Sequence, residues 1–467
     1  MLFNSYEFLF CLLPVALCGY YAVRYPGIRL VLLTLLSYLF YGWWDYRFCG
    51  LMLLSTVIDY VSGLGMGAAD TDCKRKVWIA VSVIVNLSLL GFFKYFDLAA
   101  RTINGLAAAF HGAPEELLPL LHLTLPVGIS FYTFQSMSYS IDVYRRVVEP
   151  QRSFLQFAFY VSFFPQLVAG PIVRYRDIAD QLVSRSHTWE KASRGITLFI
   201  LGFAKKVILA DGVAPLADAV FGAGHAGLVE SWTGVAAYAM QIYFDFSGYS
   251  DMAVGLGLLF GFSFPQNFNS PYKAVSITDF WRRWHMSLST WLRDYLYISL
   301  GGNQRGTFRT YVNLFLTMLL GGLWHGASWT FVIWGAYHGL LLAVERSRPS
   351  RNLLSRAPAA VQRIFTLALV MAGWVLFRCA SVSDAIGVFA GMFGAHGLMS
   401  DIMLNGQLDL SLLMLPVCLA ISLFLPNSWE IKWRHGWVQA LWLAGLFVVC
   451  VMIMLVNSSS PFLYFQF

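Results

Sequence analysis

The chain has few charged residues for its length. Of its 467 residues, 12% are charged and 58% are hydrophobic, whereas soluble domains average about 25% charged residues. This composition excludes an ordinary water-soluble domain. Apolar stretches of roughly 18 residues or more recur along the whole chain, with aromatic residues at their edges. The sequence therefore predicts an integral membrane protein.

The sequence also lacks the motifs of several common enzyme and transporter classes. It contains no G-x-S-x-G, H-E-x-x-H, P-loop or G-x-G-x-x-G pattern, which argues against metal-assisted hydrolysis and ATP-driven transport. None of its cysteines forms a C-x-x-C pair, so neither a disulfide framework nor a zinc site is predicted. The seven cysteines are Cys11, Cys18, Cys49, Cys73, Cys379, Cys418 and Cys450.

The net charge of +7 comes mostly from Lys and Arg in short loops between apolar runs, which indicates membrane topology and not nucleic-acid binding. Basic loops lie on the cytosolic side. Arg24, Arg29 and residues 74–76 are therefore expected inside and the turn at Asp45 outside, which places the N-terminus outside the cytosol. A bacterial inner membrane is the predicted location.

Two apolar runs have basic residues at both ends and helix-breaking residues in the middle. Phe154–Val173 contains Pro165 and Gly170, and the run around His325 contains three glycines in "GGLWHGASW". Such segments enter and leave a membrane on one face, because irregular backbone is tolerated there only when protein or water shields it. We expect His325 near the apex of the second hairpin.

The predicted fold is an all-α integral membrane protein. We expect roughly 10–12 transmembrane helices plus re-entrant and interfacial helices, including late spans near residues 364–381, 409–425 and 437–456. No internal repeat or linker divides the chain. Residues 1–467 are therefore predicted to form one multi-span membrane domain.

The stretch from Asn269 to Thr310 is the most polar part of the chain. Ser276 followed by Asp279 is a capping box, which predicts that a helix begins there. Apolar residues recur at helical spacing as far as Tyr295, so one continuous amphipathic helix is expected at the cytosolic interface. The helix is either a membrane-surface anchor that carries His285 as an interfacial ring, or part of a cavity. In the second case Lys273, Arg282, Arg283 and Arg293 would suit the phosphates of a nucleotide-like cofactor.

His325 is the main catalytic candidate. An ionisable group deep in a membrane domain is a functional candidate by default. Burial disfavours the charged imidazolium, so the ring is expected to be neutral and able to act as a general base. The alternative is a packed histidine whose nitrogens bond backbone or a hydroxyl such as Ser328. His338 is not surrounded by three glycines as His325 is, so it is expected to be a packed structural residue.

Asp245 and Asp251 lie in or beside the apolar run "YFDFSGYSDM". Carboxylates in such a run usually pair with another group. Ion translocation is one interpretation of this pair. Orientation of a neighbouring histidine or arginine is the other, and it is favoured.

Five segments together resemble a known family. They are "LPVGISFYTFQSMSYSIDVYR" (Leu125–Arg145), "FFPQLVAGPIVR" (Phe163–Arg174), "YFDFSGYSDMAVG" (Tyr243–Gly255), "NSPY…DFWRRWHMSLSTWLRDYLY" (Asn269–Tyr297) and "GGLWHGASW" (Gly321–Trp329). In this order they are similar to the bacterial branch of the membrane-bound O-acyltransferases (MBOAT), and most of all to the AlgI-like transferases that acetylate exported polysaccharides.

The resemblance implies a rim of spans around a thin centre, where a funnel and a tunnel meet at a histidine. It assigns catalytic roles to His325, in W-H-G, and to His285, in W-x-x-W-H. The donor is implied to be a cytosolic acyl thioester, acetyl-CoA as co-substrate, with no metal. Donor or substrate binding is expected from Trp324, Trp281, Trp284, Arg282, Arg283, Asp245 and Asn269.

The sequence thus predicts an O-acetyltransferase of exopolysaccharide biosynthesis, with alginate-like or cellulose-like polymers as the leading acceptors. His325 would take the hydroxyl proton and His285 would hold or polarise the thioester, although an acyl-histidine intermediate fits as well. The expected partners are the polysaccharide, the bilayer and a periplasmic acetyl-accepting or acetyl-transferring protein, with no nucleic acid. Two alternatives remain open, namely D-alanyl transfer to teichoic acid and a polysaccharide or ion transporter.

Overall fold

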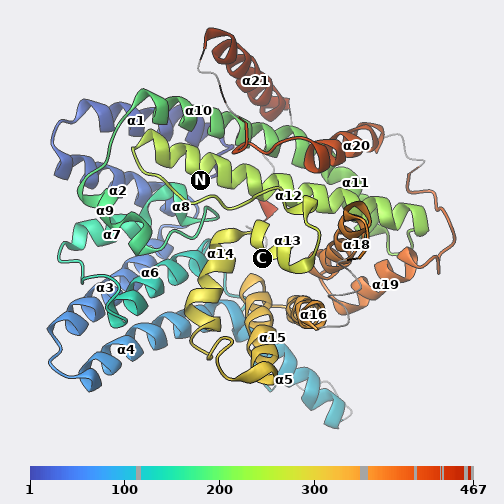
Figure 1. Cartoon of the computed structure of the whole chain (residues 1–467), viewed down its shortest axis with the longest axis horizontal. Helices are drawn as coiled ribbons and strands as arrows, with labels where there is room; N and C mark the ends of the chain where they lie inside the picture. The colour runs from blue at the N-terminus through green and yellow to red at the C-terminus, as the bar shows by residue number, and fades with distance from the viewer. Residues whose placement is uncertain are drawn as a thin grey trace. The chain divides into compact units, whose positions relative to one another are not determined.

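Every regular element of the computed structural model is a helix within the residues that it describes, so the predicted all-α class is confirmed (Figure 1). The described residues are 1–111, 117–347, 356–403, 408–431, 433, 436–456 and 461–463. The helices pack into two compact units, Met1–Ala192 with Leu256–Phe264, and Ser193–Gly255 with Pro265–Phe467. The single multi-span domain remains a prediction.

The first unit is built from short and long apolar helices. Its elements are η1 (Glu7–Leu12), α1 (Leu13–Ala22), α2 (Pro26–Gly42), α3 (Arg47–Ala68), α4 (Asp72–Leu90), η2 (Gly91–Tyr95), α5 (Phe96–His111), α6 (Ile129–Tyr144), α7 (Phe154–Ser162), α8 (Phe164–Leu167) and α9 (Tyr175–Val183). Asp59 of α3 is fully buried and accepts hydrogen bonds from Ser82 and Asn86 of α4 and from Ser140 of α6. These bonds satisfy a carboxylate that would otherwise be costly to bury.

The predicted break inside Phe154–Val173 is present. Helix α7 ends at Ser162, Phe163 leaves helical geometry with ψ at 111°, and α8 continues for four residues with Pro165 in its first turn. Proline is tolerated at that position because its missing N–H has no partner there anyway. The segment is buried along its whole central part.

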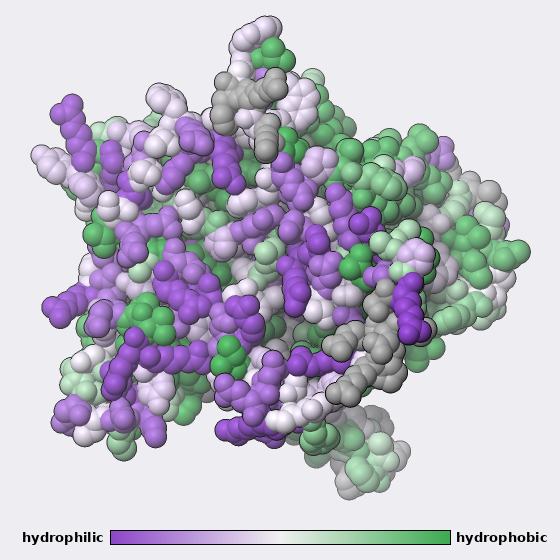
Figure 2. All heavy atoms as spheres, viewed as in Figure 1, coloured by the Kyte–Doolittle hydropathy of each residue, from purple (hydrophilic) through white to green (hydrophobic). Residues whose placement is uncertain are grey.

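The second unit surrounds the long helix α12. Its elements are α10 (Trp189–Ala204), η3 (Lys205–Ala210), α11 (Asp211–Ala223), α12 (Leu228–Leu259), η4 (Pro271–Lys273), α13 (Ile277–Arg283), α14 (Met286–Trp291), η5 (Leu292–Tyr297), α15 (Gly306–His325), α16 (Trp329–Arg346), α18 (Ala359–Arg378), α19 (Val382–Met392), α20 (Asp409–Phe424) and α21 (Trp437–Val456). Residues 237–255 of α12 are buried without interruption. Figure 2 shows hydrophilic side chains over α13 and α14, and apolar ones at the edge formed by α19 and α20.

Four helical stretches are long and apolar enough to cross a membrane within the described ranges: Arg47–Ala68, Asp72–Phe110, Ala359–Arg378 and Trp437–Val456. Four shorter apolar helices accompany them: Glu7–Ala22, Pro26–Gly42, Val382–Met392 and Asp409–Phe424. The three late spans expected from the sequence correspond to α18, α20 and α21. The expected total of ten to twelve spans remains a prediction.

Helices α15 and α16 form a close hairpin because glycines face each other along it. A methyl group added at Gly322 would lie 2.4 Å from the Phe331 carbonyl oxygen and 2.8 Å from the Gly335 Cα. One added at Gly335 would lie 2.5 Å from the Met318 oxygen. Such contact between two backbones leaves no room for a side chain. The two helices thus meet at the predicted turn in "GGLWHGASW", and the re-entrant course of this hairpin in the membrane remains a prediction.

Candidate active site

His285 lies at a sharp break between α13 and α14. Helix α13 begins as predicted, because the Ser276 hydroxyl accepts a hydrogen bond from the Asp279 amide at 3.1 Å. The helix then ends at Arg283, and His285 adopts left-handed backbone angles with φ at 42°. The expectation of one continuous helix as far as Tyr295 is therefore wrong. The break turns the His285 ring inward, where it has no exposed surface.

Asn267 holds the His285 ring and defines its hydrogen-bonding state. Its Oδ1 accepts bonds from the Ser287 amide at 3.2 Å and the Ser287 hydroxyl at 2.9 Å, while its Nδ2 donates to Ser250. The His285 Nδ1 lies 3.2 Å from the same Oδ1. Since this oxygen only accepts, Nδ1 carries the proton and Nε2 is left as an acceptor in the neutral ring. Burial lowers the pKa of His285 to about 3, so the ring is neutral at physiological pH.

His325 is the last residue of α15, next to the turn into α16, as predicted for the apex of the hairpin. Its side chain is 5% exposed, with the rings of Trp324, Trp334 and Phe377 at centroid distances of 5.0, 5.2 and 5.4 Å. Ser328, the partner considered in the packed interpretation, instead caps α16 by accepting a bond from the Thr330 amide. The aromatic rings restrict how the imidazole can rotate.

The two histidines lie close together although 39 residues separate them. Their ring centroids are 6.4 Å apart and the rings are inclined at 58°. Trp324 packs near both, with its ring 6.3 Å from that of His285. The α13–α14 break and the apex of the α15–α16 hairpin therefore bring His285 and His325 close to each other, as a site that uses both histidines requires.

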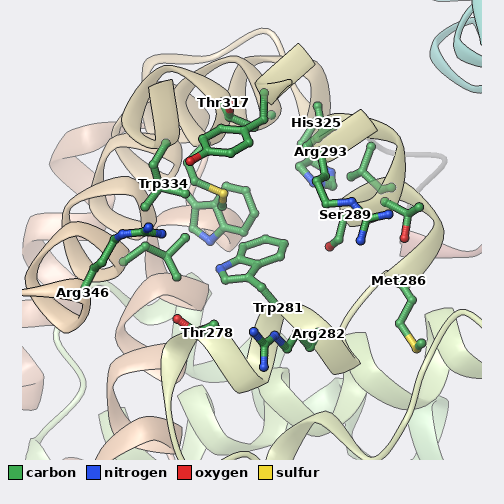
Figure 3. A pocket seen from close by; sticks show the side chains of 18 of the residues that line it. Thr278, Trp281, Arg282, Met286, Ser289, Arg293, Thr317, His325, Trp334 and Arg346 are labelled. Carbon is green, nitrogen blue, oxygen red and sulfur yellow. The ribbon is translucent and has the colours of Figure 1, made fainter. Parts of the chain in front are cut away.

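His325 lines a cavity of about 520 Å³ between the segment α13–η5 and the hairpin α15–α16. Figure 3 shows the indoles of Trp281 and Trp334 in its middle, with Arg346 on one side and His325, Ser289 and Arg293 on the other. A second cavity of about 1000 Å³ adjoins it. The residues that line both are Thr278, Arg282, Asn303, Leu314, Leu342 and Arg346.

Arginines line both cavities, and the walls are mainly apolar in the smaller cavity and largely polar in the larger one. Arg282 and Arg346 line both, and Arg293 lines the smaller one while pairing with Asp294 at 2.7 Å. Glu345, in the larger cavity, accepts a hydrogen bond from the Ile277 amide at 2.7 Å at the start of α13. Guanidinium groups in this arrangement can bind phosphates, and the apolar end beside His325 can receive an acyl chain.

Of the predicted binding residues, Arg282 and Trp281 line the cavities and Trp324 contacts both histidines. The Trp281 indole donates a hydrogen bond at 3.3 Å to Nδ1 of His338, a buried residue of α16. The expectation that His338 packs is confirmed. His338 also fixes the orientation of a cavity wall through this bond.

The structure places three other predicted residues away from both cavities. Trp284 is 1% exposed and packs in an aromatic cluster with Phe268 and Trp374. Arg283 pairs with Asp279 at 2.8 Å. The Asn269 amide donates to the Arg283 carbonyl oxygen, and the Asn269 carbonyl oxygen accepts from the Arg283 guanidinium. The Asn269 side chain accepts from the Asn427 amide group. All of these contacts hold the α13 segment in place.

Asp245 and Asp251 pair with lysines, where the sequence favoured a histidine or an arginine. Lys206 lies 2.7 Å from Asp245 and 2.9 Å from Asp211, and Lys205 lies 2.6 Å from Asp251. Lys206 also donates to the Pro461 oxygen, and the Leu463 amide donates to Asp245. The charges thus fix η3 and residues 461–463 against α12, outside the cavities.

Sequence reasoning missed Asn267, Trp334 and Lys206. Only Lys206 had a visible signal, because two adjacent lysines interrupt the apolar run "ITLFILGFAKKVILA". Asn267 lies in an irregular loop, and Trp334 resembles any other aromatic residue of an apolar helix. Among the described residues there is no group of three or more His, Cys, Asp or Glu side chains that could hold a metal ion.

Comparison with known proteins agrees with this geometry. Residues 146–382 match the model of the membrane-bound O-acyltransferase family, MBOAT. The matched range contains both histidines and the whole cavity that His325 lines.

Three curated relatives extend the match. The chain is 49% identical to "Probable alginate O-acetylase AlgI" of Azotobacter vinelandii, over 84% of this chain and 78% of the relative. The protein of the same name from Pseudomonas putida is 43% identical over 100% of both chains. A Helicobacter pylori "Peptidoglycan O-acetyltransferase" is 34% identical over 100% of this chain and 98% of the relative. The chain therefore belongs to the membrane-bound O-acyltransferase family and is a membrane enzyme that transfers acyl groups to oxygen.

Proposed function

We propose that this enzyme moves an acetyl group from cytosolic acetyl-CoA across the inner membrane for O-acetylation of an exported polysaccharide. The observation that carries the proposal is a pair of buried histidines, 6.4 Å apart, one of which lines a cavity together with three arginines: His325 lies there with Arg282, Arg293 and Arg346. The relatives from Azotobacter, Pseudomonas and Helicobacter carry the names of alginate and peptidoglycan O-acetyl transferases. An alginate-like polymer is therefore the first acceptor to test.

The two adjoining cavities suit the two ends of an acyl-CoA. The larger one contains Arg282 and Arg346, which would hold phosphates, and the smaller one leads between Trp281 and Trp334 to His325. Apolar walls would exclude water from the thioester and protect it from hydrolysis. Entry of the donor from the cytosol and a funnel from the opposite face are parts of the proposal, as is an N-terminus outside the cytosol.

In the proposed reaction His325 takes the proton of the attacking hydroxyl as its oxygen bonds to the acyl carbon. The C–S bond then breaks, and the proton passes to the departing thiolate. Such general-base assistance contributes about 10²–10⁴-fold in rate. The Trp324, Trp334 and Phe377 rings keep the imidazole in one orientation.

For His285 we propose a role other than the one that its motif first suggested. Because Asn267 holds the proton on Nδ1, the neutral ring accepts a hydrogen bond at Nε2 and does not donate one to a carbonyl oxygen. We therefore assign His285 to orient the hydroxyl of the acceptor, or of a partner protein that carries the group onward. A covalent acyl-histidine would form on His325, if at all.

The test measures transfer from radiolabelled acetyl-CoA in vesicles that contain the full-length protein, alginate and its candidate periplasmic partner. Wild type should acetylate the polymer. His325→Ala should lose about 10²-fold or more of the rate, and His285→Ala should lose less but remain clearly impaired. His225→Ala, which removes an exposed histidine before α12, should keep the wild-type rate.

Three outcomes would contradict parts of this proposal. A folded His325→Ala that keeps its rate would make the histidine a packing residue. Transfer that requires D-alanyl carrier protein and is not supported by acetyl-CoA would assign the chain to teichoic acid modification. Label that appears on peptidoglycan but not on alginate would change only the acceptor.

A further inference from the structure

A cluster of cations surrounds Tyr20 in the first unit. The Arg29 guanidinium lies 5.0 Å from the centre of the Tyr20 ring, and Arg185 donates to the Tyr20 hydroxyl at 2.9 Å. His187 bonds the same hydroxyl through Nε2 at 2.9 Å. Lys191 donates to the oxygen of Gly261, and a methyl group added at Gly261 would lie 2.9 Å from the His187 ring. We refer to Tyr20, Arg29, Arg185, His187 and Lys191 as the Tyr20 cluster.

Within the described residues, neutral groups contact the cations of this cluster. Arg29 donates to the Val23 oxygen, Arg185 also lies over the Phe262 ring, and Lys191 bonds Ser186, so each cation rests on a neutral group. No carboxylate of the described chain forms an ion pair with Arg29, Arg185 or Lys191. Burial and the three neighbouring cations lower the pKa of His187. Like charges held this close attract an anion from outside the protein.

The surroundings of the cluster indicate what kind of anion this is. Arg29 sits in the first turn of α2, and an exposed apolar stripe runs along that helix away from it. The stripe consists of Ile28, Val31, Leu35 and Leu39 at helical spacing, 53%, 41%, 64% and 50% exposed. Helices α1 and α2 are both apolar. A ligand that contacts both the cations and the stripe needs an anionic head and apolar chains.

Exposed aromatic side chains flank the cluster in the sequence, which is the pattern of a membrane–water interface. Tyr21, Tyr25 and Trp189 are 50%, 72% and 92% exposed beside the cluster. Tyrosine and tryptophan are enriched where apolar spans meet the headgroups. Figure 2 shows hydrophilic side chains over the region of α1, α2 and α9. A soluble phosphate has no apolar chain that could contact the adjoining apolar stripe.

We propose that the Tyr20 cluster binds the phosphate of an anionic phospholipid, whose acyl chains lie along the exposed stripe of α2. The phosphate accepts hydrogen bonds from Arg185, Arg29 and Lys191, in each case from N–H groups that the protein's own bonds leave available. The lipid would join the α1–α2 turn to the loop between α9 and α10. Neutral lipids lack the net charge that this site selects.

The experiment titrates delipidated, full-length protein in detergent with dioctanoyl-phosphatidylglycerol, dioctanoyl-phosphatidylcholine and sn-glycerol 3-phosphate, and follows binding by native mass spectrometry. Wild type should bind phosphatidylglycerol at least tenfold more tightly than either other ligand, and salt should weaken that binding. Arg185→Gln/Lys191→Gln should weaken it about 30-fold. Each Lys or Arg near an anionic lipid surface contributes about 1 kcal/mol, and the loss of two such contributions corresponds to about 30-fold in affinity. Lys74→Gln, whose lysine pairs with Asp70, should bind like wild type.

The charge-preserving variant Arg185→Lys/Lys191→Arg separates charge from folding, and it should bind clearly more tightly than the Gln variant, because it keeps both positive charges that attract the lipid. Equal binding of the two lipids by wild type would overturn the proposal. So would phosphatidylglycerol binding that survives in the folded Gln variant or falls equally in the charge-preserving one. Glycerol phosphate that binds as tightly as the lipid would show a site for free phosphate and refute the lipid assignment.

Discussion

The single residue that determines what His285 can do is Asn267. The Ser287 backbone N–H can only donate a hydrogen bond, so the atom that faces it must be the Asn267 Oδ1. This bond fixes the orientation of the Asn267 carboxamide. The His285 Nδ1 then has to donate to the same oxygen, so Nε2 is presented as an acceptor. A different residue at position 267 would change the chemistry of the histidine without touching the substrate.

Asn267→Ala should lower kcat for acetyl transfer by about tenfold or more, with little change in KM for acetyl-CoA, because the His285 ring loses its fixed tautomer. Asn267→Asp should keep more activity. Its carboxylate would stabilise the imidazolium and raise the pKa of His285, so the acidic limb of the pH–rate profile should move to higher pH. The measurement is kcat and KM across pH for both variants.

Asn313→Ala provides the control for a general loss of packing. Asn313 is fully buried on α15 and donates to the Gly302 oxygen, far along the helix from His325. Its removal should lower thermal stability and leave the pH profile in place. If Asn267→Asp leaves the profile unmoved as well, Asn267 only supports the loop.

At the scale of elements, local patterns predicted where helices start but not where tertiary contacts interrupt them. Ser276 and Asp279 marked the start of α13, and the glycines around His325 marked the hairpin. The break at His285 was not visible, because it depends on the Met286 amide reaching the Asn267 oxygen in a distant loop. Helical spacing as far as Tyr295 favoured a continuous helix, and the tertiary bonds outweighed that local preference.

The glycine contact between α15 and α16 leaves no room for a larger residue at position 335. Gly335→Ala should destabilise the protein by about 1–3 kcal/mol, because the added methyl group lies against the Met318 carbonyl oxygen. The backbone of a packed helix cannot shift locally to relieve this clash. Since the two helices carry His325 and one cavity wall, acetyl transfer should fall as well. Thermal unfolding followed by tryptophan fluorescence, together with the transfer rate, provides the check.

Gly445→Ala is the matched control for that change. Gly445 lies inside α21 with nothing within 4 Å of an added methyl group. Alanine there should be neutral or slightly stabilising, because glycine costs a helix about 1 kcal/mol relative to alanine. A Gly335→Ala protein as stable as the Gly445→Ala protein would mean that α15 and α16 have more freedom than their packing indicates.

At the scale of the whole molecule, buried lysine–carboxylate pairs connect segments that are far apart in the sequence. Lys206 joins Asp245, 39 residues away, and the oxygen of Pro461, 255 residues away. Phe462 is 1% exposed and packs edge-on against Tyr249. Sequence periodicity describes neighbours along one helix, so it detected the carboxylates but not their partners. The pairs account for both aspartates without any transported ion.

A double-mutant cycle on this pair distinguishes a structural role from ion transport. Lys206→Met alone should cost about 3–5 kcal/mol, because Asp245 then stays buried without its partner. Asp245→Asn alone should cost less, because Lys206 keeps its ion pair with Asp211. Lys206→Met/Asp245→Asn should be more stable than Lys206→Met alone, since no buried charge at position 245 then lacks its partner. Thermal unfolding of the four proteins gives the coupling energy, and ion flux is followed in the same vesicles without acetyl-CoA. Additive losses of stability, together with a wild-type ion flux that stops in Asp245→Asn, would show that Asp245 serves an ion pathway. A large coupling energy without ion flux would instead show that Asp245 holds residues 461–463 and η3 against α12.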